Sequence, residues 1–211
     1  MSTHQPWWLA LPLAAAAVTF APAAHADPGF GLVPEFKFGP NFGSVPGEDP
    51  RTGKYTAANS TGSSGWLFEG AFDAFYANNV FAIGSSFGYV VQGLASEGRR
   101  TTIGMGYNGF TITPMFMLAL SSRISLVAHG GLVIGDIGDG QADDVGALGW
   151  RVGAQLLFVV VRGAHSDITL GLEYLHTEAT GTYPDNSTVG YAGNAIVLTT
   201  TMSFFSDMLD L

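Results

Sequence analysis

Apolar and polar residues alternate along much of the chain with a period of two, the pattern of β-strands whose two faces meet different surroundings. In the segment 148–160 every second residue is apolar, and the positions between include Arg151 and Gln155. The segment 168–175 repeats this pattern with Glu173 between its apolar positions, and 66–76 carries Glu69 and Asp73 on one face only. Charged side chains therefore share one face of each strand, which favours a polar interior and an apolar exterior.

The same pattern predicts eight strands, in the segments 32–42, 66–76, 80–91, 110–120, 124–134, 148–160, 168–175 and 191–205. Pro34 and Pro40 fall in the first of these, where we expect them at bulges or weakly paired positions. The strands are long enough to cross a bilayer at a tilt, which takes about 9 to 11 residues. Aromatic residues cluster near the expected strand ends, as in the two interfacial girdles of membrane barrels.

The connections alternate between two kinds. Short turns are expected at 77–79, 121–123 and 163–166, and longer segments rich in Gly, Asp and Ser at 47–64, 93–108, 135–146 and 179–190. Bacterial membrane barrels keep short turns on the periplasmic side and long loops outside. A membrane barrel must also close, because an unpaired backbone group in hydrocarbon costs several kcal/mol. We therefore predict an all-β fold: an eight-stranded antiparallel transmembrane β-barrel with up-and-down meander topology.

The amino-terminal residues have the features of an export signal. Residues 9–17 form a short apolar stretch, and Ala24-His25-Ala26 is a small-x-small cleavage site. We expect a signal peptide at 1–26, the outer-membrane barrel at 27–205 and a short carboxy-terminal tail at 206–211.

Composition supports a membrane barrel. Charged residues make up only 12% of the chain, against roughly 25% in soluble domains, while hydrophobic residues make up 47%. Cysteine is absent, which excludes disulfides, thiolate metal sites and a lipoprotein anchor. The formal net charge of −9, with only eight Lys and Arg residues, argues against nucleic-acid binding.

With this topology, the signal at Ala24-His25-Ala26 and an amphipathic strand at 196–205, the chain resembles the small eight-stranded outer-membrane barrels of the OmpA, OmpX and OmpW type. The resemblance covers nearly all of residues 27–211. It implies an outer-membrane location, and it implies that the terminal strand is read by the barrel-assembly machinery. Family members usually end on an aromatic residue, whereas here residues 206–211 follow Phe205.

The expected lumen is the first candidate site. Alternation directs seven titratable residues inward, and they are Glu35, Lys37, Glu69, Asp73, His129, Arg151 and Glu173. Buried charges must pair or be neutralised, so these residues form either a rigid polar plug or the lining of a narrow pore or ligand cavity. Counting from the strand ends, we expect Glu69, Arg151 and Glu173 to interact. Glycines at 84, 88, 149, 153 and 171 favour a roomier lumen.

Two weaker candidates lie elsewhere. The acidic connection at 135–144 holds Asp136, Asp139, Asp143 and Asp144, whose oxygens suit a calcium ion. The spacing matches neither an EF-hand nor a nonapeptide repeat, and an acidic loop of this kind is more often simply solvated. His176 and Glu178 lie near the outer end of the seventh strand, where some barrels that resemble this one carry lipid-acyl chemistry. The His-x-Ser signature of those enzymes is absent, and His165-Ser166 falls in an expected periplasmic turn.

We therefore expect a monomeric, non-enzymatic outer-membrane protein with no catalytic residue and no cofactor. Its role is structural or surface-interactive through extracellular loops. The alternatives are a narrow pore or passage for a small molecule, hydrophobic molecules included, and, less favoured, a lipid-modifying enzyme. The expected partners are outer-membrane lipid, lipopolysaccharide and, during biogenesis, the assembly machinery.

Overall fold

The computed structural model describes residues 29–48, 55–77, 80–97, 102–138, 144–162, 167–184, 186 and 188–202. The expected signal peptide at 1–26 and tail at 206–211 lie outside these residues, so both boundaries remain predictions. In the described part of the chain no helix has the length and apolar character needed to cross a membrane.

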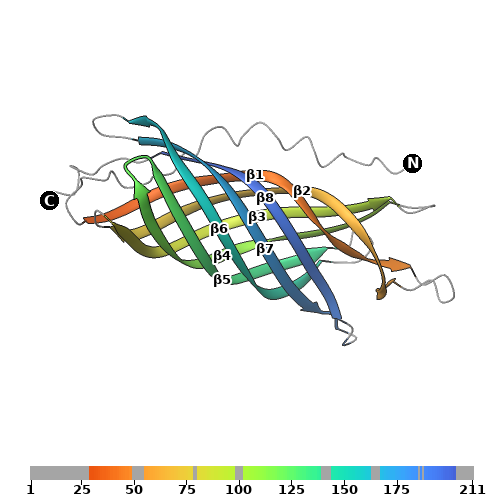
Figure 1. The fold of residues 1–211 in the computed structure, drawn as a ribbon. Helices are drawn as coiled ribbons and strands as arrows, with labels where there is room; N and C mark the ends of the chain where they lie inside the picture. The colour runs from red at the N-terminus through yellow and green to blue at the C-terminus, as the bar shows by residue number, and fades with distance from the viewer. Residues whose placement is uncertain are drawn as a thin grey trace, which may run out of the picture.

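Eight strands form one closed barrel in which each strand pairs with the next in sequence and β1 closes against β8, always antiparallel (Figure 1). The strands are β1 (Gly29–Glu48), β2 (Tyr55–Ala77), β3 (Phe81–Glu97), β4 (Thr102–Ser121), β5 (Ile124–Gly138), β6 (Val145–Arg162), β7 (Asp167–Thr182) and β8 (Thr188–Met202). The strand number, the antiparallel pairing and the closure confirm the predicted fold class. Closure also leaves the sheet without an edge.

We call the end of the barrel with the long connections the hairpin side, and the opposite end, with the short turns, the turn side. At the hairpin side the strands extend further than the sequence indicates. The segments 47–64 and 93–108, expected as loops, are largely strand in β2, β3 and β4, and pairing between β3 and β4 continues to Glu97 opposite Thr102. Their Gly, Ser and Thr residues show little alternation in polarity, so the sequence pattern did not predict strands there. The backbones of two strands already in register nevertheless continue to pair beyond the membrane-crossing part. With 15 residues in β5 and 23 in β2, the strands exceed the 9 to 11 or so needed to cross a bilayer. In Figure 1 the ends of β1 and β3 extend furthest to the right, and β7 meets β8 at the lower right.

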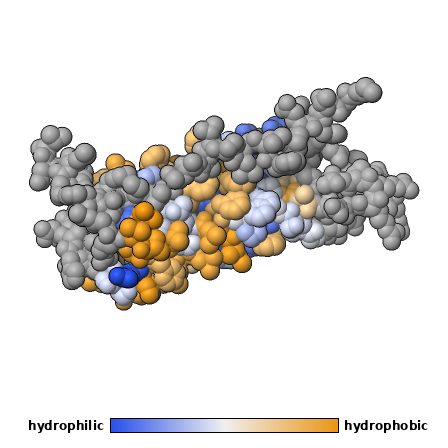
Figure 2. Space-filling view, turned by 90° about the horizontal axis from the view of Figure 1, so that it is seen from above, coloured by the Kyte–Doolittle hydropathy of each residue, from blue (hydrophilic) through white to orange (hydrophobic). Residues whose placement is uncertain are grey.

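The outer face carries a band of exposed apolar side chains, seen over the middle of the face shown in Figure 2. The band draws on every strand, including Leu32 of β1, Phe72 of β2, Phe87 of β3, Phe116 of β4 and Leu172 of β7. In β7 buried and more exposed residues alternate along the whole strand. An apolar exterior around a closed set of backbone hydrogen bonds is the requirement for a β-structure in lipid.

At the hairpin side of this band, aromatic side chains pair with amides. The Tyr89 hydroxyl donates to Asn108 Oδ1 at 3.1 Å, and the Tyr174 hydroxyl donates to Asn194 Oδ1 at 2.6 Å. Tyrosine suits the border between hydrocarbon and water because its ring is apolar and its tip is polar.

The seam between β1 and β8 is interrupted at the two prolines. Pairing runs from Glu35 opposite Thr201 to Gly43 opposite Gly193, and within this stretch Gly39 and Pro40 have no register partner on β8. Pro34 lies just before the paired stretch begins. Both prolines therefore occupy weakly paired positions, as predicted, because proline has no N–H to donate to the neighbouring strand.

Candidate functional site in the barrel lumen

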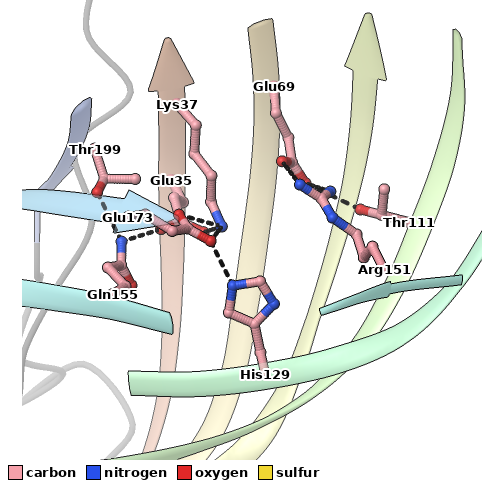
Figure 3. A network of polar contacts seen from close by, with 9 residues as sticks. All are labelled: Glu35, Lys37, Glu69, Thr111, His129, Arg151, Gln155, Glu173 and Thr199. Atoms are coloured by element: carbon pink, nitrogen blue, oxygen red, sulfur yellow. Dashed lines mark hydrogen bonds and ion pairs between the residues drawn. The ribbon is translucent and has the colours of Figure 1, made fainter. Parts of the chain in front are cut away.

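All seven titratable residues expected in the lumen lie on the inward face. Glu35 and Lys37 come from β1, Glu69 and Asp73 from β2, and one residue each from β5, β6 and β7, namely His129, Arg151 and Glu173. Their side chains are buried. Six of the seven form two neighbouring groups, with Gln155 and Thr199 beside one group and Thr111 beside the other (Figure 3).

The first group is a charge-balanced pair. Arg151 donates from both terminal nitrogens to Glu69, with 2.8 Å to Oε1 and 2.9 Å to Oε2. The Thr111 hydroxyl adds a 3.1 Å hydrogen bond to Glu69 Oε1. A guanidinium matches a carboxylate in this two-bond geometry, which an ammonium cannot reproduce.

The second group has two carboxylates on one fixed base. Lys37 Nζ lies 3.0 Å from Glu35 Oε2 and 3.0 Å from Glu173 Oε2, and His129 Nε2 contacts the other oxygen of Glu173. Gln155 Nε2 donates to Glu35 Oε1 at 3.0 Å and to Thr199 Oγ1 at 2.8 Å. Both oxygens of Glu35 therefore face a donor, whereas the hydrogen bonds to Glu173 converge on Oε1 and its Oε2 has only the ion-pair contact with Lys37. Such contacts are needed to keep a charge in a low-dielectric interior.

The expected grouping of Glu69, Arg151 and Glu173 is corrected in part. Arg151 pairs with Glu69, but Glu173 pairs with Lys37 and His129. Counting residues from the strand ends gave the wrong height for Glu173, because tilt and stagger shift each strand of a barrel along its neighbour.

Asp73 lies apart from both groups. It is opposite Ser86 in the β2–β3 register, and its Oδ1 has no hydrogen-bond partner among the described residues.

Three neutral members of the network, Thr111, Gln155 and Thr199, were not singled out from the sequence. Alternation does direct Gln155 inward. Threonine gives no such signal, because it is equally suited to either face of a strand.

The lumen glycines do not widen the barrel as expected. A Cβ on Gly88 would lie 2.9 Å from Glu69 Oε1, and one on Gly153 would lie 2.5 Å from His129 Nε2. A Cβ on Gly171 would lie 2.5 Å from Thr199 Oγ1. These three glycines make room for the polar network itself. At Gly84 and Gly149 the nearest atom is a backbone oxygen of the next strand, at 2.1 Å and 1.9 Å, so these two allow close approach of strands instead.

Apolar clusters lie at two levels of the interior. One, on the turn side, includes Val33, Phe75, Met117 and Leu157. The other, on the hairpin side, is larger and includes Leu67, Leu94, Leu175, Tyr107 and Tyr191. The Asn41 amide hydrogen-bonds the Tyr191 hydroxyl at 2.5 Å within this second cluster. The lumen is thus layered as apolar, charged and apolar, an arrangement in levels that the sequence pattern did not predict.

The acidic connection does not assemble into a metal site in the part the structure describes. Asp136 and Asp144 are exposed, whereas Asp139 and Asp143 lie outside the described residues. Within the described ranges no group of three or more His, Cys, Asp and Glu side chains is arranged to hold a metal ion.

His176 lies on the outer face, as expected, and Asn194 of β8 is a partner that the sequence did not reveal. Its Oδ1 is 2.9 Å from His176 Nδ1, while Glu178 Oε1 is 3.2 Å from His176 Nε2. Both imidazole nitrogens therefore face oxygen acceptors. A serine-type catalytic set would need a hydroxyl at one of these two positions. His165 and Ser166 lie outside the described residues.

A closed meander of eight strands, an apolar outer band and a filled, partly charged interior together define a membrane barrel. The chain is a small eight-stranded outer-membrane β-barrel. It is therefore located in the outer membrane, where proteins of this architecture occur.

No family model and no curated protein matches the chain. Among solved structures, the attachment invasion locus protein Ail of Yersinia pestis, in complex with the heparin analogue sucrose octasulfate, matches at 12% identity and a TM-score of 0.44, covering 84% of this chain and 99% of Ail. Neisserial surface protein A gives the same four values. The outer membrane protein OprG of Pseudomonas aeruginosa matches at 12% identity and a TM-score of 0.39, covering 85% and 96%. At these values the resemblances assign no activity to this chain.

Proposed function

We propose that this outer-membrane barrel is a closed, non-enzymatic scaffold whose role is structural or surface-interactive and is carried by its extended hairpins. The observation that carries the proposal is the layered lumen. Charged side chains that hold one another by short hydrogen bonds lie between two apolar clusters, and glycines fit around them. Such an interior stabilises the barrel and leaves interaction to the outside.

The alternative of a narrow passage for a small molecule, hydrophobic molecules included, needs a path past the hairpin-side cluster. Leu67, Leu94 and Tyr191 are all almost fully buried there, so a passing molecule has to displace them. The packing argues for the closed form. The lesser alternative, a lipid-modifying enzyme, lacks support because the described neighbours of His176 supply an amide and a carboxylate but no hydroxyl nucleophile.

We further propose that the short turns face the periplasm and the long hairpins face outside, where outer-membrane lipid and lipopolysaccharide surround the barrel. Assembly by the barrel-assembly machinery and a monomeric state complete the proposal. The apolar outer band needs only lipid to cover it, and the charge balance disfavours nucleic acid.

A planar-bilayer conductance measurement tests the closed-scaffold proposal. Insertion is first established by a heat-modifiable band, which migrates faster unboiled than boiled. Properly inserted wild-type protein should then show no steady single-channel steps. A double Tyr107→Ala and Tyr191→Ala variant, which hollows the hairpin-side cluster, serves as a matched control for detecting a passage. Steady steps from the wild type that become larger in this variant would replace the scaffold with a pore through the lumen.

A further inference from the structure

Five side chains form a compact patch on the outer face of β6, β7 and β8, which we call the interfacial patch: Trp150, Tyr174, His176, Glu178 and Asn194. Trp150 and Glu178 are direct cross-strand partners in the β6–β7 register, and His176 is opposite Asn194 in the β7–β8 register. The Trp150 and His176 rings pack with centroids 5.1 Å apart. Tyr174 and His176 both contact Asn194 Oδ1.

The patch lies at the border of the apolar band. On the turn side of it, Val152, Leu172 and Ile196 are exposed apolar residues. On the other side, Thr180 is polar and exposed, and its cross-strand partner Leu148 is the exposed apolar residue at that level of β6. Aromatic residues at such a border sit at the level of lipid headgroups. The patch is also open, since Trp150 is 43% exposed, Tyr174 is 51% exposed and the Glu178 side chain is 49% exposed.

Among the described side chains the half-exposed Glu178 carboxylate has one hydrogen-bonding contact, with His176 Nε2 at 3.2 Å. Both nitrogens of His176 face acceptor oxygens, on Asn194 and on Glu178. A neutral imidazole has a single N–H and can satisfy only one of them. The Tyr174 hydroxyl is already directed at Asn194. No Lys or Arg in the described residues forms an ion pair with Glu178.

We propose that the interfacial patch binds the primary ammonium group of a lipid headgroup. The ammonium donates N–H to Glu178, and the face of Trp150, on the neighbouring strand, attracts the same charge. Glu178 repels a phosphate, so the amine end of a headgroup enters the patch. Phosphatidylethanolamine and lipid A that carries an amine substituent both supply this group.

Lipid retention in nanodiscs tests the proposal. The barrel is reconstituted in phosphatidylcholine that contains equal amounts of phosphatidylethanolamine and its N-acetyl derivative, which has no charge on nitrogen. Lipids kept by the protein are then counted by native mass spectrometry. We expect phosphatidylethanolamine to be enriched about fivefold over its acetylated form. This is the enrichment expected when the free energies of an exposed ion pair and a cation–π contact add. A second arm compares amine-modified with unmodified lipid A, and enrichment in one arm alone identifies the source.

Glu178→Gln should bring the enrichment close to one. The matched control is Asp136→Asn, which removes an exposed carboxylate from β5 outside the patch and should leave the enrichment unchanged. Both variants are checked for heat-modifiable migration. Equal retention of the two lipids by the wild type in both arms, full enrichment in Glu178→Gln, or enrichment that requires added Mg²⁺ would overturn the proposal.

Discussion

The two charged groups of the lumen solve the same problem differently. Arg151 and Glu69 cancel each other in one two-bond contact, whereas Lys37 serves both Glu35 and Glu173 with help from His129 and Gln155. The first group is balanced in charge, and each of its two charged residues has only the other as a counter-charge within the group. The second carries excess negative charge but has several donors, so losing one donor leaves others in place. We therefore expect equal chemical changes to have unequal effects in the two groups.

The largest effect is expected from Glu69→Gln. It leaves the buried Arg151 guanidinium without a counter-charge, which costs about 3 to 5 kcal/mol of unfolding free energy. Urea unfolding in liposomes measures the loss. A double Glu69→Leu and Arg151→Met variant is the control, because removing both charges should restore most of the stability. If the single variant is as stable as wild type, the balanced pair does not stabilise the barrel.

Lys37→Met should cost less, about 1 to 3 kcal/mol, since Gln155 and His129 still donate to the two carboxylates that remain. The deficit should shrink at mildly acidic pH, because protonation of one carboxylate lets it donate to the other. Unfolding of variant and wild type at neutral and acidic pH measures this. A deficit that grows as pH falls contradicts the shared-donor account.

Arg151→Lys keeps the charge and removes the two-bond geometry. We expect a loss of about 1 kcal/mol, the value of one charged hydrogen bond reduced by rearrangement of the flexible lysine. Comparison with Glu69→Gln in the same assay separates geometry from charge. Equal losses in the two variants would mean that the fork geometry, and not charge balance, holds the pair.

The smallest effect is expected from Glu35→Gln. It loses one hydrogen bond but also removes part of the excess negative charge, so the net change should stay within about 1 kcal/mol. This variant makes the same substitution as Glu69→Gln in the other group, and a loss as large as that of Glu69→Gln would remove the distinction between the groups.

The sequence predicted which residues face the lumen but not how they combine. Period-two alternation directs Glu35, Arg151 and Glu173 inward because a strand permits only two faces. Partners depend on the stagger between strands, which local patterns do not encode, so Glu173 was assigned to the wrong group. The hairpin-side cluster was not predicted for a related reason. Alternation places Leu67 and Leu175 on the same inward faces as Glu69 and Glu173, but it does not show that apolar residues from different strands meet at one level.

The Gly39–Pro40 interruption has a mechanical consequence. Among the seams that the structure describes, β1 and β8 are paired over the shortest stretch, from Glu35 to Gly43, and their ladder is interrupted within it at Gly39 and Pro40. The longer β4–β5 ladder is also interrupted, at Thr113 and Pro114, but it has paired residues over a longer stretch on both sides of the gap. Under a force applied to the carboxy-terminal end, we expect rupture to start here and β8 to peel away from β1 before any internal hairpin yields. Single-molecule extraction from a bilayer would record this as a low first force peak, and Pro40→Val, which supplies the missing N–H, would raise it.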